Sequence, residues 1–171
     1  MQREDKLAQK VLCYGLLTVL LYLLETATPL HRVQLLEVKI DVLACLPAAA
    51  ALFEGPVLGA IIGFLTGVLY DLAGNGIEGL YPVYYMLFAA FAGVLSGQWL
   101  RRMWASHLLL ITAEMLLLRI VELGLHLIVE THFPTLPFLQ LMYAQVLVAL
   151  LFSPVIYGLC NWISRRFERY Q

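Results

Sequence analysis

Apolar residues dominate six stretches of the chain, and charged residues, glycine or proline separate them. A helix needs about 20 mostly apolar residues to cross the hydrocarbon core of a bilayer, and shorter helices occur where protein shields them. The pattern therefore predicts an all-α membrane protein with six transmembrane helices in a single integral membrane domain over residues 1–171. The predicted spans are residues 10–28, 40–53, 56–72, 80–99, 107–129 and 138–163.

Only Glu54, Gly55 and Pro56 separate the second predicted span from the third. Proline suits the first turn of a helix, because the N–H that it lacks would have no partner there. Both spans are short for a membrane crossing. We therefore expect them to form a tight helical hairpin.

The composition supports a place in the membrane. The 171 residues are 61% hydrophobic and 13% charged, with a mean hydropathy of +0.82, whereas a soluble domain is about 45–50% apolar and about 25% charged. One small core cannot hide this excess, so much of the apolar surface is expected to face membrane lipid. The net charge of −1 gives no reason to expect a nucleic-acid partner.

The basic residues predict how the spans are oriented. Lys and Arg collect on the cytoplasmic side of membrane proteins. With six spans, most of the basic residues outside the spans fall on one side, so both termini are expected in the cytoplasm. That side holds Arg3, Lys6, Lys10, Arg101, Arg102, Arg165, Arg166 and Arg169, and the other side holds Arg32 and Lys39.

The first apolar run also resembles a cleavable signal peptide, because a basic segment precedes it and small residues follow it. Glu25 interrupts the region before any cleavage site, and the chain beyond it is itself apolar. Proteins with several spans normally use the first span as the insertion signal. A retained first transmembrane helix is therefore the favoured interpretation.

Glycine recurs every four residues in and just before the third predicted span, at Gly55, Gly59, Gly63 and Gly67, and the next step reaches Asp71. In lipid, helices associate largely through close packing of small residues. Steps of four advance by about 40° around a helix, so the glycines form a continuous groove. A neighbouring span of the same chain is the favoured occupant of this groove, and a partner protein is the alternative.

Two carboxylates are predicted at the outer ends of spans. Asp41 opens the second span, and Asp71 closes the third, where water reaches it and its charge costs little. Asp71 either caps the glycine-rich turn that follows, by accepting backbone N–H bonds, or contacts a partner or ligand. The sequence leaves these two roles open.

The fifth predicted span carries the most charge. Glu114, Arg119, Glu122 and His126 fall on one side of a helical wheel. The spacing allows Arg119 to pair with Glu122 and places Glu122 beside His126. Ionisable groups within a membrane face a bundle interior or a wet cavity. A polar network that holds this span to its neighbours is the favoured interpretation, and a ligand site or proton relay is the alternative.

The chain has no nucleotide-binding, zinc-protease or serine-hydrolase motif. Its three cysteines, Cys13, Cys45 and Cys160, lie in apolar runs without metal-binding spacing. We therefore expect a protein that is not an enzyme and that needs no cofactor or metal.

The central part of the chain resembles the core of the MreD family, the rod-shape-determining membrane proteins of bacteria. The resemblance is strongest over residues 38–97 and extends over about 10–165, with the same length, about six spans and a short basic C-terminus. A proline usually precedes the family's aspartate in span two, where this chain has Ile40. The matching positions are Asp41, Gly63, Phe64, Gly67, Asp71 and the glycine-containing loop 74–79.

This resemblance implies a non-enzymatic function in the machinery that elongates the bacterial cell wall. MreD-like proteins lie in the cytoplasmic (inner) membrane and act beside an MreC-like partner. Through that partner they act with a RodA-type glycosyltransferase and a class B penicillin-binding protein. The glycine groove would then hold the fold together or receive the single transmembrane helix of the MreC-like protein.

The layout is also similar to the S components of energy-coupling-factor vitamin importers, whose six-span bundle the MreD family is thought to share. S components typically carry an Ala-x-x-x-Ala motif in span one, but here Leu12 follows Ala8 at that spacing. Arg119, Glu122 and His126 could line an outward-opening vitamin pocket. A substrate-binding subunit of a vitamin importer is therefore the alternative function.

Overall fold

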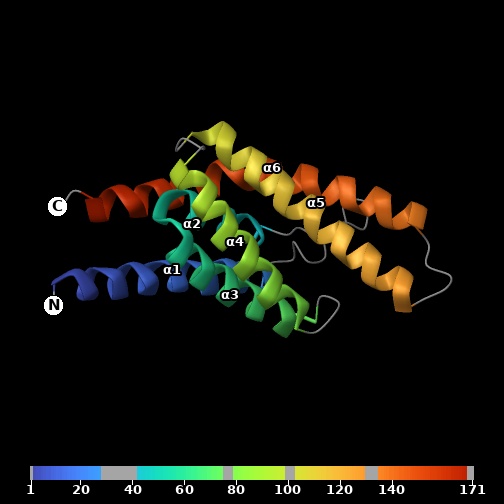
Figure 1. Ribbon diagram of the computed structural model, residues 1–171, viewed down its shortest axis with the longest axis horizontal. Helices are drawn as coiled ribbons and strands as arrows, with labels where there is room; N and C mark the ends of the chain where they lie inside the picture. Colours follow the sequence, from blue (N-terminus) through green and yellow to red (C-terminus); the bar gives the residue numbers. More distant parts are fainter. Residues whose placement is uncertain (1, 28–41, 75–78, 99–102, 130–134, 169–171) are drawn as a thin grey trace.

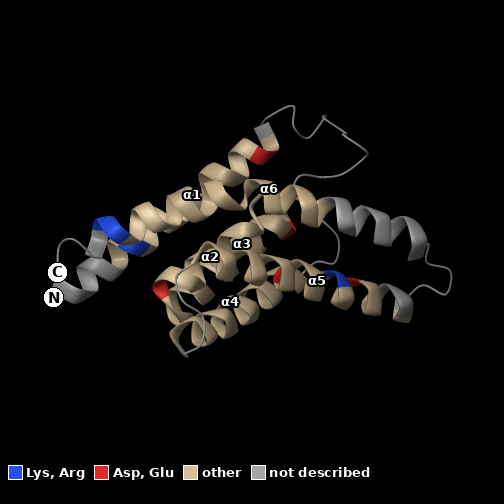
Figure 2. Cartoon of the chain, turned by 90° about the horizontal axis from the view of Figure 1, so that it is seen from above, with Lys and Arg blue, Asp and Glu red and all other residues tan. Residues whose placement is uncertain are grey.

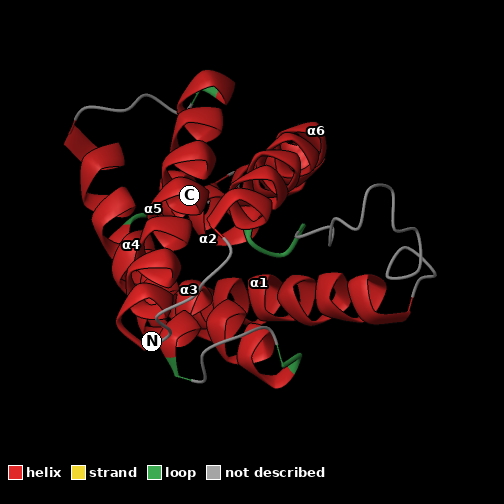
Figure 3. Ribbon diagram, turned by 90° about the vertical axis from the view of Figure 1, so that its right-hand side faces the viewer, coloured by secondary structure: helices red, strands yellow, loops and turns green. Residues whose placement is uncertain are grey.

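The computed structural model describes residues 2–27, 42–74, 79–98, 103–129 and 135–168, and over these residues it contains helices and turns but no strand (Figure 3). The predicted all-helical class is therefore confirmed. The helices are α1 (Gln2–Ala27), α2 (Cys45–Glu54), α3 (Pro56–Leu72), α4 (Leu80–Gln98), α5 (Trp104–Val129) and α6 (Thr135–Glu168).

Consecutive helices run in opposite directions along the bundle (Figure 1). The hydrogen bonds between them follow this order, since residues early in one helix meet residues late in the next. Lys10 of α1 reaches Glu54 at the end of α2, and Tyr81 at the start of α4 reaches Glu122 late in α5. The start of α1 and the end of α6 therefore lie at the same end of the bundle (Figure 1).

Within the described residues, three helices contain segments that are long and apolar enough to cross a membrane. The helices α2 and α3 are apolar but shorter, with 10 and 17 residues. In α5 the apolar residues are interrupted by Glu114, Arg119 and Glu122. The three candidate spans are Ala8–Thr26, Leu80–Gly97 and Gln145–Arg166.

The short helix α2 forms the centre of the bundle. All of its residues from Cys45 to Phe53 are buried, and it contacts α3, α4, α5 and α6. Its 10 residues span about 15 Å, roughly half of the hydrocarbon thickness. It does not need the length of a membrane span, because neighbouring helices surround its alanine-rich surface.

The predicted start of this helix, at residue 40, was too early. Residues 42–44 form a turn whose carbonyl groups accept hydrogen bonds from the amides of Cys45 and Leu46. The apolar run continues through this turn, so hydropathy does not mark where the helix begins. Residues 40 and 41 lie outside the described residues. Helix α3 has the predicted bounds, whereas α1 begins at Gln2 because good helix formers, although polar, precede its apolar part.

The predicted hairpin between α2 and α3 is present. Gly55 is the only residue between the two helices, and its φ of +87° is a conformation that glycine adopts without strain. Its amide donates to the carbonyl oxygen of Ala51 at 3.1 Å, and Pro56 begins α3. The first glycine of the series therefore makes the turn and is not part of the groove.

The remaining glycines of α3 let other helices approach its backbone. A Cβ atom placed at Gly59 would lie 2.9 Å from the Cα atom of Ala51 in α2. At Gly63 and Gly67 it would lie closer than 3.0 Å to backbone atoms of α4, at Tyr85 and Pro82 respectively. Helix α4 also has such a glycine: a Cβ atom placed at Gly93 would lie closer than 3.0 Å to the backbone of Pro56 in α3.

These contacts predict that Gly63→Ala destabilises the fold. The added methyl group would meet the Tyr85 carbonyl group, which cannot move away without shifting α4, and overpacking of this kind costs about 1–3 kcal/mol. Denaturant unfolding in detergent measures the loss. Gly158→Ala in α6 is the matched control, because nothing lies within 4 Å of the Cβ position there. Equal stability of the two variants would contradict the packing.

Candidate functional site

Four polar residues from three helices meet in what we call the Arg119 network: Tyr81 of α4, Arg119 and Glu122 of α5, and Gln145 of α6. Arg119 Nη1 lies 2.6 Å from Glu122 Oε2, and the Tyr81 hydroxyl donates to Glu122 Oε1 at 2.8 Å. Arg119 Nη2 donates to Gln145 Oε1. Both oxygens of the Glu122 carboxylate are therefore occupied.

The Arg119 network is largely shielded from the surroundings. The side chains of Arg119 and Glu122 are 17% and 6% exposed. A charged pair at this depth needs such additional hydrogen bonds, because each desolvated charge is otherwise poorly compensated. The network holds α5 to α4 on one side and to α6 on the other, as the network interpretation of this span requires.

Glu114 does not join the Arg119 network, although the wheel places it on the same side of α5. Its side chain is fully buried, and neither carboxyl oxygen has a hydrogen-bond partner among the described residues. Its own backbone carbonyl accepts a hydrogen bond from the Tyr84 hydroxyl of α4. The eight positions between Glu114 and Glu122 correspond to about 12 Å along the helix, which separates the two carboxylates. The side chain of His126 lies outside the described residues.

His107, near the start of α5, pairs with Ser153 of α6. The Ser153 hydroxyl oxygen lies 3.1 Å from His107 Nδ1, and both side chains are fully buried. A serine beside a histidine is also the arrangement of a nucleophile and its base. Here the pair is enclosed by packed helices, and its contact holds the start of α5 to α6.

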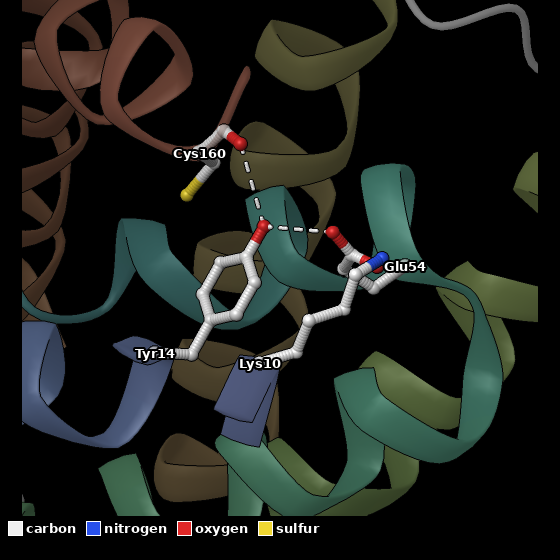
Figure 4. A network of polar contacts seen from close by, with 4 residues as sticks. All are labelled: Lys10, Tyr14, Glu54 and Cys160. Atoms are coloured by element: carbon white, nitrogen blue, oxygen red, sulfur yellow. Dashed lines mark hydrogen bonds and ion pairs between the residues drawn. The ribbon is translucent and has the colours of Figure 1, made fainter. Parts of the chain in front are cut away.

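A second group of polar contacts, the Lys10 network, was not predicted. It joins Lys10 and Tyr14 of α1, Glu54 of α2 and the backbone of Cys160 in α6 (Figure 4). Lys10 Nζ lies 2.6 Å from Glu54 Oε2, whose side chain is 5% exposed. The Tyr14 hydroxyl lies 3.3 Å from Glu54 Oε1 and 3.4 Å from the Cys160 carbonyl oxygen, and its single proton serves one of these acceptors at a time.

The sequence contains only part of the information that would predict the Lys10 network. Lys10 and Tyr14 are four residues apart and share a helix face, and Glu54 interrupts two apolar runs. Lys10 was interpreted only as a cytoplasmic charge and Glu54 only as part of the hairpin link. Their pairing depends on how α1 lies across the end of α2, which no local pattern records.

Asp71 caps the turn at the end of α3. Its Oδ2 accepts a hydrogen bond from the amide of Gly79 at 2.7 Å, and its backbone carbonyl accepts one from Gly74 at 2.9 Å. This is the geometry of the local-cap alternative. Asp41, the other predicted carboxylate, lies outside the described residues.

The glycine groove is occupied within the chain itself. Gly63 and Gly67 contact α4, and Gly59 contacts α2. A partner helix therefore has no access to these glycines in this fold. Among the described residues, no three His, Cys, Asp or Glu side chains are grouped so as to hold a metal ion.

No protein-family model and no curated protein sequence matches this chain. No solved structure matches it either. The MreD resemblance therefore depends on the matching positions in the sequence alone.

The Arg119 network predicts that the charges of Arg119 and Glu122 stabilise the protein only when both are present. Glu122→Leu is expected to destabilise the protein by about 3 kcal/mol or more, because it leaves a guanidinium group inside the bundle without its carboxylate. Combining it with Arg119→Met removes both charges and is expected to recover part of that loss. Denaturant unfolding in detergent measures all three proteins.

Arg165→Ala is the control for this pair, because Arg165 is exposed near the end of α6. It is expected to change stability by less than about 0.5 kcal/mol. A double variant that is less stable than Glu122→Leu alone would show that the two charges do not depend on each other.

Proposed function

We propose that this chain is a non-enzymatic membrane scaffold of the bacterial cell-elongation machinery, with a role similar to that of MreD proteins and an MreC-like protein as its partner. The observation that supports a scaffold is that the charged side chains inside the bundle bind other side chains of the same bundle. Arg119 binds Glu122 and Gln145, and Lys10 binds Glu54. These side chains join helices to each other, which is what a rigid membrane platform requires.

The proposed topology has six spans, with both termini on the cytoplasmic side of the bacterial inner membrane. The alternating helix directions support it, as does the position of the start of α1 and the end of α6 at one end of the bundle (Figure 1). Basic residues of α1 and α6 lie toward that same end (Figure 2). There Arg166 lies over the ring of Trp162 at 5.3 Å, a pair suited to the membrane interface.

This topology predicts the behaviour of reporter fusions. Alkaline phosphatase, which is active only outside the cytoplasm, is expected to be inactive when fused after Gln171 and active when inserted at residues 75–78. Green fluorescent protein is expected to give the opposite result at the same two positions. Active phosphatase at Gln171 would overturn the proposed orientation.

The partner is proposed to meet the outer surface of the bundle. Gly63 and Gly67 contact α4, so the single transmembrane helix of an MreC-like protein would contact a lipid-facing side instead. Large apolar side chains are exposed along α1, including Leu12, Leu16 and Leu23. Through its partner the scaffold would act on a RodA-type glycosyltransferase and a class B penicillin-binding protein.

Purification in detergent, with the MreC-like protein of the same cell expressed alongside, tests this proposal. We expect capture of that protein and no vitamin-like molecule in mass spectrometry of the purified complex. A vitamin bound in a stoichiometric amount would overturn the scaffold and identify the S component of a vitamin importer instead. Failure to capture the partner would overturn the proposed partnership.

The double variant Arg119→Met with Glu122→Leu separates the two functions further. In a scaffold it keeps partner capture, because the Arg119 network lies inside the bundle and away from the proposed contact surface. In an importer whose pocket uses these side chains, it removes the bound ligand.

A further inference from the structure

Glu114 differs from the other described carboxylates of the chain. Glu54 pairs with Lys10, Glu122 pairs with Arg119, and Asp71 and Glu25 each accept an amide hydrogen bond. The carboxyl oxygens of Glu114 have no ion-pair or hydrogen-bond partner among the described residues. Its side chain is nevertheless fully buried. It lies near the middle of α5, where the helix faces the core.

The groups that face Glu114 supply no positive charge. Helix α2 contacts α5, and its buried residues, Cys45 to Phe53, include no cationic side chain. Tyr84 of α4 donates its hydroxyl hydrogen to the backbone carbonyl oxygen of Glu114. On α5 itself, His107 pairs with Ser153 of α6 and Arg119 pairs with Glu122.

Two further titratable side chains on the packed helices, Cys45 and Tyr157, cannot carry a positive charge. Cys45 of α2 donates its thiol to the carbonyl oxygen of Ala149 in α6, and Tyr157 of α6 packs against the His107 ring. The neighbours of Glu114 along the buried face of α5 are Leu110, Ile111, Met115 and Leu118. The surroundings are therefore apolar apart from weak dipoles.

An ionised carboxylate in such a place is far more costly than a neutral acid. Removing a charge from water without a partner costs so much that a buried group normally becomes neutral instead. A carboxyl group becomes neutral by binding a proton, and the protonated form also fits among apolar side chains. The same physics makes ionisable groups rare inside membranes unless they carry out a task.

We propose that Glu114 is a proton-binding site, held as a neutral carboxylic acid between α2, α4 and α5. When the chain folds, a new O–H bond forms at one carboxyl oxygen, and the proton comes from the bulk solvent. The side chain changes from one negative charge to none. Releasing that proton requires α5 to move away from α2, or water to enter between them, because only then is the carboxylate solvated.

This site connects folding to pH. The folded chain holds a proton that the unfolded chain, in water, loses at neutral pH. Because the folded state then binds more protons than the unfolded state, stability falls as the pH rises. Glu114→Gln keeps the shape of the neutral acid and cannot release this proton, so it should remove the part of the dependence that Glu114 contributes.

Infrared difference spectroscopy of the folded protein in detergent at about pH 7 tests the site directly. We expect the carbonyl stretch of a protonated carboxylic acid, exchanging slowly with deuterated water because the group is buried. The band should disappear in Glu114→Gln and shift in Glu114→Asp. It should persist in Glu54→Gln, the control at a carboxylate that is ion-paired. Absence of the band from the unaltered protein, or its survival in Glu114→Gln, overturns the proposal.

Thermal unfolding gives a second readout. Between about pH 5 and pH 9, the unfolding temperature of the unaltered protein should fall more steeply with pH than that of Glu114→Gln. Equal slopes would contradict the site. If Glu114→Gln does not fold, the shifted band of Glu114→Asp and the slow exchange of the original band still decide the matter. None of these measurements requires the partner proposed above.

Discussion

The contact between the backbones of α3 and α4 is the constraint on which the rest of the bundle depends. Gly63, Gly67 and Gly93 bring the two helices so close that a single methyl group would not fit between them. In lipid, where apolar side chains gain little by leaving the solvent, such close packing is a main source of helix association. With α3 fixed in this way, Tyr81 and Tyr84 of α4 face α5 and bind it through Glu122 and the Glu114 backbone.

A second close contact, between α2 and α3, gives α2 its position. The turn at Gly55 brings α2 back along α3, and Gly59 allows Ala51 to approach the backbone of α3. Helix α2 is then enclosed, so it needs neither the length nor the lipid-facing side chains of an ordinary span. Its alanines are suited to this place because small side chains let four helices surround it at once.

Local patterns in the sequence predicted the parts of the structure that depend on neighbours along the chain. The turn at Gly55 and Pro56 and the pairing of Arg119 with Glu122 follow from spacing within a few residues. The start of α2 was missed because Val42 to Ala44 are as apolar as the helix. The isolation of Glu114 and the pair of Lys10 with Glu54 were missed because they depend on how distant helices cross. A helical wheel gives the side of a helix but not the neighbour that each residue meets.

The hydrogen bond from Tyr14 to Cys160 joins residues that are 146 positions apart, and its acceptor is a backbone carbonyl group. During synthesis the first helix emerges long before the last one, so this bond can form only after the whole chain has been made. The pair of Lys10 with Glu54 can form much earlier, once the second helix is in place. Because the backbone supplies the acceptor, a side chain small enough for this fully buried position could replace Cys160 without removing the bond. The contact between α1 and α6 at Tyr14 can therefore form only after the pair of Lys10 with Glu54, and it depends on the backbone of α6.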